Sequence, residues 1–121
     1  MPTKLTKALE FANYRVTLNN QQHSLKAKTE TLLTYSVNGG TFSIDQSLIA
    51  FCKLLLDENI TETVLLDVYE HPILIADLSE FYNDVFSRYF EVINEYYIEY
   101  EKLKSARKVH KVLDINESYN S

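Results

Sequence analysis

Residues 32–45 read LLTYSVNGGTFSID and contain both glycines of this 121-residue chain. Apolar and polar side chains alternate on either side of the Asn38-Gly39-Gly40 stretch, which is the period of a half-buried β-strand. Asparagine and glycine readily adopt the positive φ angles that a tight hairpin turn requires. The stretch therefore predicts a β-hairpin over about residues 32–44, and it leaves no glycine elsewhere for a phosphate-binding loop.

A short helix and a second extended pair are predicted after this hairpin. Asp45 can cap a helix over about residues 45–57, whose run LIAFCKLLL is too apolar to face water on more than one side. The runs TVLLD (63–67) and PILI (72–75) then predict an extended pair over about residues 63–75. Because proline cannot donate a ladder hydrogen bond, Pro72 should lie at an edge or at the start of its strand.

A long helix is predicted before the hairpin, over about residues 3–31. Its apolar residues recur every seven positions, as in a coiled coil: Phe11, Leu18, Leu25 and Leu32. Three positions before each of these is a smaller or polar residue: Ala8, Arg15, Gln22 and Thr29. Such a face can be an ordinary packing surface, or it can leave room for a partner.

A second long helix is predicted over about residues 78–112, followed by a polar tail at 113–121. Asp77 and Glu80 have the spacing of a capping box at its start. Two sevenfold series follow along the helix: Tyr82, Tyr89, Tyr96 and Leu103, and Phe86, Ile93 and Tyr100. Aromatic residues at helical spacing form a packing face or, alternatively, a stacking platform for bases or peptides.

These elements predict one domain over residues 1–121, of the α+β class and mostly helical. Two long helices with matching sevenfold patterns should pack against each other in a coiled-coil-like manner. The simplest chain path makes them antiparallel, joined by a small head of two β-hairpins and the short helix.

The charges are strongly segregated along the chain. Residues 29–101 contain fourteen acidic and two basic residues, whereas the flanking segments carry a net positive charge. In an antiparallel pair the flanking segments would meet at a basic pole, our candidate partner-binding surface: Lys4, Lys7, Arg15, Lys102, Lys104, Arg107, Lys108 and Lys111. The bound partner would be an acidic protein surface or nucleic acid, although solvated charge near a terminus explains the same residues.

The sequence offers no catalytic constellation, so we expect no enzyme, no cofactor and no metal. His23, His71 and His110 lie far apart, and the single cysteine, Cys52, is surrounded by apolar residues. Glu91, Glu95 and Glu99 form an acidic stripe that fits a solvated helix face better than a metal site. No run is apolar enough for a membrane span or a secretory signal, so a cytoplasmic location is expected.

Two resemblances suggest a class of function. The helix, hairpin, helix plan resembles prefoldin chaperone subunits in architecture, although the extra helix and second hairpin depart from that pattern. The runs ALEFANYRVTLNNQ (8–21), LLTYSVNGGTFSID (32–45), HPILIADL (71–78) and EYYIEYEKLKSAR (95–107) together are similar to the head vertex assembly chaperones of large contractile-tailed phages. This likeness implies a non-enzymatic helper that binds a capsid or other virion protein, and it leaves homo-oligomerisation open. A nucleic-acid-associated regulator that uses the basic pole is the second hypothesis.

Overall fold

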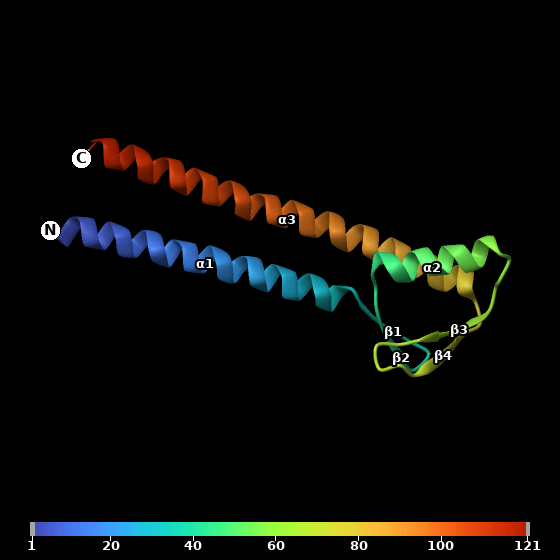
Figure 1. The fold of residues 1–121 in the computed structure, drawn as a ribbon. Helices are drawn as coiled ribbons and strands as arrows, with labels where there is room; N and C mark the ends of the chain where they lie inside the picture. The colour runs from blue at the N-terminus through green and yellow to red at the C-terminus, as the bar shows by residue number, and fades with distance from the viewer. Residues whose placement is uncertain (1, 121) are drawn as a thin grey trace. The chain divides into compact units, whose positions relative to one another are not determined.

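The computed structural model describes the backbone of residues 2–120 and the side chains of residues 4–106. Within them the chain is mostly helical, with three helices and two small antiparallel sheets (Figure 1). In chain order the elements are α1 (Pro2–Leu32), β1 (Thr34–Val37), β2 (Gly40–Ser43), α2 (Gln46–Asp57), β3 (Thr63–Leu66), β4 (Pro72–Ile75) and α3 (Leu78–Asn120). The predicted mixture of long helices and two hairpins is therefore confirmed, while α3 continues beyond the predicted end near residue 112.

The chain divides into two compact units. Unit 1 comprises residues 1–27 and 95–121, and unit 2 comprises residues 28–94. The single domain over residues 1–121 stays a prediction, and the two units are described separately below.

The first hairpin of unit 2 has the turn that its sequence predicts. Strands β1 and β2 pair from Thr34 with Ser43 to Val37 with Gly40. Asn38 and Gly39 occupy the two central turn positions with φ angles of 52° and 80°. Both are in the left-handed region, which asparagine and glycine tolerate better than other residues.

The second hairpin contacts the first through backbone and side chains. Strands β3 and β4 pair from Thr63 with Ile75 to Leu66 with Pro72. The N–H of Val68 donates to the carbonyl oxygen of Thr41 at 2.9 Å, which ties the β3–β4 turn to β2.

Helix α2 begins at a side-chain cap. The Asp45 carboxylate accepts a hydrogen bond from the Leu48 N–H at 2.8 Å, which satisfies one of the free donors at the helix start. At the other end Asn59 takes a φ of 63° and turns the chain toward β3. The apolar face of α2 includes Cys52, which is fully buried.

The core of unit 2 joins β2, α2, β3, β4 and the start of α3. Its buried apolar residues are Phe42, Ile44, Cys52, Leu65, Ile75, Leu78, Phe81 and Val85. Phe42 and Phe81 pack edge to face at 5.3 Å between ring centroids, so α3 is joined to β2 by an aromatic contact.

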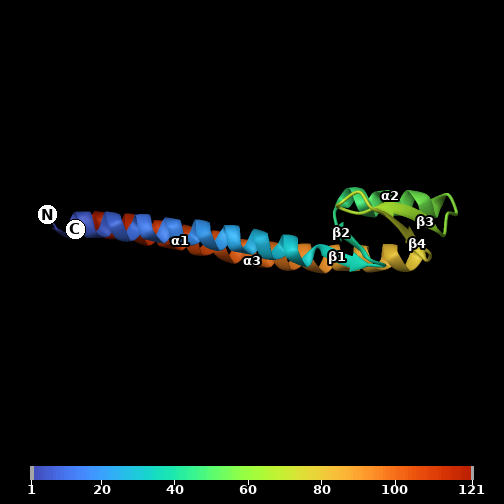
Figure 2. The same ribbon diagram turned by 90° about the horizontal axis from the view of Figure 1, so that it is seen from below.

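Unit 1 consists of the first part of α1 and the second part of α3, which run in opposite directions (Figures 1 and 2). Leu18 is its one buried apolar side chain among the described residues. The Tyr14 hydroxyl donates to the carbonyl oxygen of Ala106 at 3.0 Å, a direct link between the two helices. None of the described helices has an apolar stretch of the length needed to cross a membrane.

Candidate protein-binding surfaces

A hollow between α2 and α3 is lined by four aromatic side chains of unit 2. Its open volume is about 360 Å³, within the size range of ligand-binding sites. We call it the aromatic groove, and its lining residues are Gln46, Ile49, Ala50, Lys53, Tyr82, Phe86, Tyr89 and Phe90.

The α3 wall of the aromatic groove is a ladder of rings one helical turn apart. Tyr82 and Phe86 stack with centroids 5.8 Å apart, and Phe86 and Phe90 stack at 6.3 Å. Phe86 is 46% exposed and Phe90 is 61% exposed, although phenylalanine has no polar atom to offer water. At the α2 wall, the Gln46 amide donates to the Tyr89 hydroxyl at 3.1 Å. The groove is therefore apolar, open and held between two helices.

A second apolar surface lies on the β3–β4 hairpin. Val64, Leu66 and Leu74 are 53–64% exposed, while Leu65 and Ile75 on the opposite face are buried in the core. We call the exposed side the outer hairpin face; its residues are Val64, Leu66, Pro72 and Leu74. A sheet with one wet face normally alternates apolar and polar residues, and this hairpin does not.

A buried carboxylate shapes the turn beside this face. The Asp67 side chain is 2% exposed and accepts backbone N–H hydrogen bonds from Thr41 (3.1 Å), Tyr69 (2.9 Å) and His71 (2.9 Å). Burial acts to raise the pKa of the Asp67 carboxyl, but these donors outweigh burial and hold that pKa below its usual value. Asp67 is thus an ionised anchor for the turn, and not a proton donor.

A polar cluster on the β1 side has a similar structural role. The Tyr35 hydroxyl donates to Asp84 at 3.2 Å, and the Arg88 guanidinium lies 5.1 Å from the centroid of the Tyr35 ring. Burial, followed by the negative charge of Asp84, raises the pKa of the Tyr35 phenol. The phenol therefore stays protonated at neutral pH and joins β1 to α3.

The single cysteine, Cys52, is a core residue and not an accessible nucleophile. Cys52 is completely buried, and that burial raises the pKa of its thiol to about 11. At neutral pH the thiolate, which is the nucleophilic form, is scarce. No group of three or more His, Cys, Asp or Glu side chains that could hold a metal ion occurs within the part of the chain that the structure describes.

The predicted basic pole is only partly within the described side chains. Lys4, Lys7, Arg15, Lys102 and Lys104 are all exposed. Lys102 pairs with Glu99 at 3.1 Å. Arg107, Lys108 and Lys111 lie outside the described side chains, so convergence of all eight cations stays a prediction.

The predicted packing seam has members in both units. In unit 1 Leu18 is buried, Phe11, Leu25, Tyr96 and Leu103 are half-buried, and Tyr100 is exposed. In unit 2 Tyr82, Tyr89 and Ile93 are half-buried, and Leu32 and Phe86 are exposed. The sevenfold pattern predicts that Arg15 lies on the packing face of α1. In the structure Arg15 is exposed, and its neighbour Tyr14 is half-buried instead.

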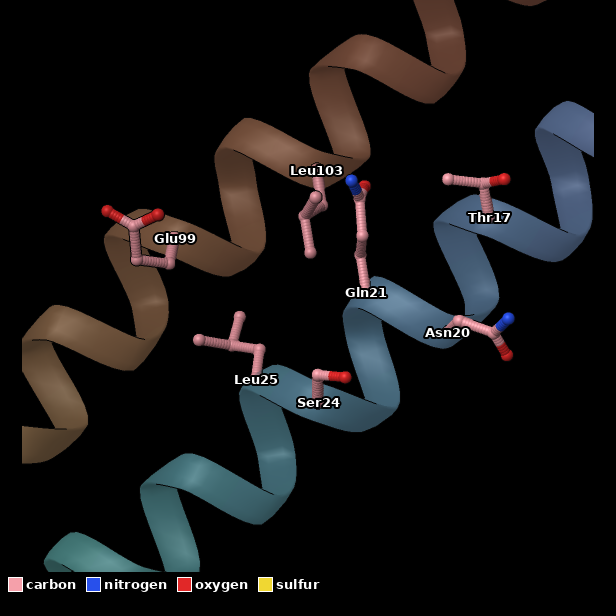
Figure 3. Close-up of a pocket in the computed structure, with 7 residues that line it drawn as sticks. All are labelled: Thr17, Asn20, Gln21, Ser24, Leu25, Glu99 and Leu103. Carbon is pink, nitrogen blue, oxygen red and sulfur yellow. The ribbon is translucent and has the colours of Figure 1, made fainter.

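Unit 1 has a hollow of its own, with an open volume of about 390 Å³. Leu25 and Leu103 point into the space between the two helices (Figure 3). The remaining lining residues are polar: Thr17, Asn20, Gln21, Ser24 and Glu99. Because these groups are well solvated, this hollow offers a partner less apolar contact than the aromatic groove.

Sequence periodicity did not find the two apolar surfaces of unit 2. Ile49 and Ala50 belong to the groove only because α2 lies beside α3, which the linear pattern does not specify. The outer hairpin face did have a signal, since the runs TVLL and PILI show no polar alternation. The absence of polar alternation predicts a hairpin with two apolar faces. It does not predict which of the two faces is buried in the core and which is exposed.

Comparison of the chain with known protein families, with curated proteins and with solved structures finds no match.

Proposed function

We propose that this chain is a non-enzymatic assembly factor that binds an amphipathic helix of another protein in the aromatic groove of unit 2. The observation that carries the proposal is the exposure of Phe86 and Phe90 in a preformed groove. The ladder from Tyr82 to Phe90 spans about 12 Å of helix, or about two turns. Helix-in-groove recognition uses apolar anchors over this length.

The charge of unit 2 defines the partner further. Unit 2 holds eleven acidic and three basic residues, a formal net charge of −8. Inside the groove the positive Lys53 is offset by Asp57, 3.2 Å away. A partner helix with a positive polar face is therefore favoured electrostatically, and nucleic acid is repelled.

Antiparallel coiled-coil packing of the two long helices is also part of the proposal. The Tyr14 hydrogen bond to Ala106 and the burial of Leu18 in unit 1 support it. The likeness to head vertex assembly chaperones would make the partner a capsid or other virion protein, bound before assembly.

The test begins by cross-linking the chain in the cells that produce it and identifying the captured protein by mass spectrometry. The purified partner is then titrated against the wild type and against Phe86→Ala/Phe90→Ala. Loss of two aromatic anchors should weaken binding by about thirtyfold or more. A matched control is Phe51→Ala/Leu54→Ala, because both residues are exposed on α2 but do not line the groove.

The proposal fails if the groove variant binds within about twofold of the wild type, or if the control loses as much affinity. Binding of duplex DNA or RNA that falls steeply with salt and requires Lys4 and Lys7 would instead favour the basic-pole hypothesis.

A further inference from the structure

We infer that the outer hairpin face is a second docking surface, and that it takes a basic amphipathic segment of the partner, with aliphatic side chains flanked by Lys or Arg. The inference rests on the proposed function in one respect, that the partner is a protein. It concerns a different surface, formed by the β3–β4 hairpin and not by the groove between α2 and α3.

The outer hairpin face is apolar across both strands. Val64 lies opposite Leu74 in the ladder, and Leu66 lies opposite Pro72. Leu66 is 64% exposed, more than any residue of the hairpin's inner face, where Leu65 is 6% exposed. A face of a two-stranded sheet is buried only when another element packs against it. In the described part of the chain, the inner face of this hairpin is covered in this way and the outer face is not.

The segment that contains the outer hairpin face has acidic but no Lys or Arg side chains. Residues 54–87 contain eight Asp or Glu and no Lys or Arg. Glu62 is exposed and lies one residue before the start of β3. Glu70 lies exposed in the β3–β4 turn, with a φ of 62°. An apolar face with an acidic rim is complementary to aliphatic side chains flanked by cations.

This charge pattern favours a basic segment of the partner over two other possible ligands of the outer hairpin face, a second copy of the chain and nucleic acid. A second copy packed face to face would bring Glu62 and Glu70 of both copies together, which is repulsive. Nucleic acid would meet the same acidic rim. The four-residue strands span about 13 Å, which accommodates between about two and three turns of a helix laid on the sheet.

The first experiment uses two synthetic helical peptides with the same leucine stripe, one with Lys and Arg on its polar positions and one with Glu there. Their affinities for the full chain are measured by isothermal titration calorimetry. We expect the basic peptide to bind about tenfold or more tightly than the acidic one. Its affinity should weaken as the Debye length falls from about 10 Å at 0.1 M salt to about 3 Å at 1 M.

Three variants locate the bound peptide. Leu66→Thr/Leu74→Thr removes the apolar surface while keeping residues suited to strands, and it should reduce affinity about tenfold or more. Glu62→Lys should reduce affinity about threefold to tenfold without touching the apolar contacts. Because the aromatic groove also favours a basic amphipathic helix, the basic peptide is titrated in addition against Phe86→Ala/Phe90→Ala, which lacks the groove anchors. The binding that remains in this variant should fall about tenfold or more when Leu66→Thr/Leu74→Thr is added. Circular dichroism checks that each variant is folded.

Several results would overturn the inference. Among them are equal binding of the two peptides, wild-type affinity in Leu66→Thr/Leu74→Thr, and a loss seen only in the groove variant. A wild-type dimer that Leu66→Thr/Leu74→Thr dissociates in sedimentation analysis would make a second copy the occupant. Titration of the natural partner distinguishes failure of this inference from failure of the proposed function. If its affinity falls in the groove variant but stays at the wild-type value in the hairpin variants, only the present inference is wrong.

Discussion

At the scale of single residues, Asp67 is the polar group with the most structural consequence, because one carboxylate fixes the turn between β3 and β4. Its pKa in the folded chain lies below the ordinary value of 3.8, since backbone donors favour the ionised form. Its contribution to stability is therefore fully present above pH 3.8 and is lost as the pH falls through that value toward the folded pKa.

We expect Asp67→Asn to lower the thermal midpoint at neutral pH and to reduce the loss of stability in acid. The asparagine amide would place a donor against the Thr41 N–H, which now donates to the Asp67 carboxylate at 3.1 Å. Thermal unfolding followed across pH by circular dichroism measures both effects. Asp57→Asn is the control, because Asp57 is exposed and its removal should change little. An unchanged acid profile in Asp67→Asn would contradict this account.

Gly40 is required by close packing and not by backbone conformation. A methyl group there would lie 2.5 Å from Cγ1 of Ile73, well inside contact distance. Gly40→Ala should therefore reduce the free energy of unfolding by about 1–3 kcal/mol. Urea unfolding measures it, and adding Ile73→Ala should recover part of the loss. Gly39→Ala is the contrast: nothing lies within 4 Å, but its φ of 80° is strained for alanine, so Ile73→Ala should not rescue it.

At the scale of elements, the caps show why local features are predictable. The Asp45 side chain accepts from Leu48, three residues away, and Asp77 accepts from Glu80 at 3.1 Å. Asp45→Ala should destabilise the chain by about 1 kcal/mol, whereas Asp45→Asn, which also caps well, should cost a few tenths. Chemical unfolding distinguishes them, and equal losses in the two variants would mean that the charge of Asp45 matters more than its cap.

Such local signals explain how much of the fold the sequence predicts. The Asn38-Gly39 turn and the α2 cap depend on neighbours in the chain, so the hairpin and the helix start follow from the residues alone. The aromatic groove depends on α2 packing beside α3, a tertiary contact between residues far apart in the sequence. Phe86 illustrates the limit. Its sevenfold spacing predicts an apolar helix face, yet the side chain is 46% exposed because the groove between α2 and α3 is open.

At the scale of the whole molecule, burial is distributed unequally between the two units. Eight of the nine buried apolar residues among the described side chains belong to unit 2, and Leu18 alone belongs to unit 1. Parts of a protein with few buried apolar contacts open with a lower free energy than its core. Unit 1 should therefore open without global unfolding of unit 2.

Native-state hydrogen exchange with mass spectrometry tests this expectation directly. Amides of α1 in unit 1 should exchange faster than those of α3 around Val85, and denaturant should raise their exchange at lower concentrations. Leu18→Ala should reduce protection in unit 1 alone. Leu78→Ala removes a fully buried side chain of the unit 2 core and should lower the free energy of unfolding there by about 2–5 kcal/mol. If Leu18→Ala instead reduced protection equally in both units, the molecule would unfold as one cooperative structure, and the independence of the two units would be wrong.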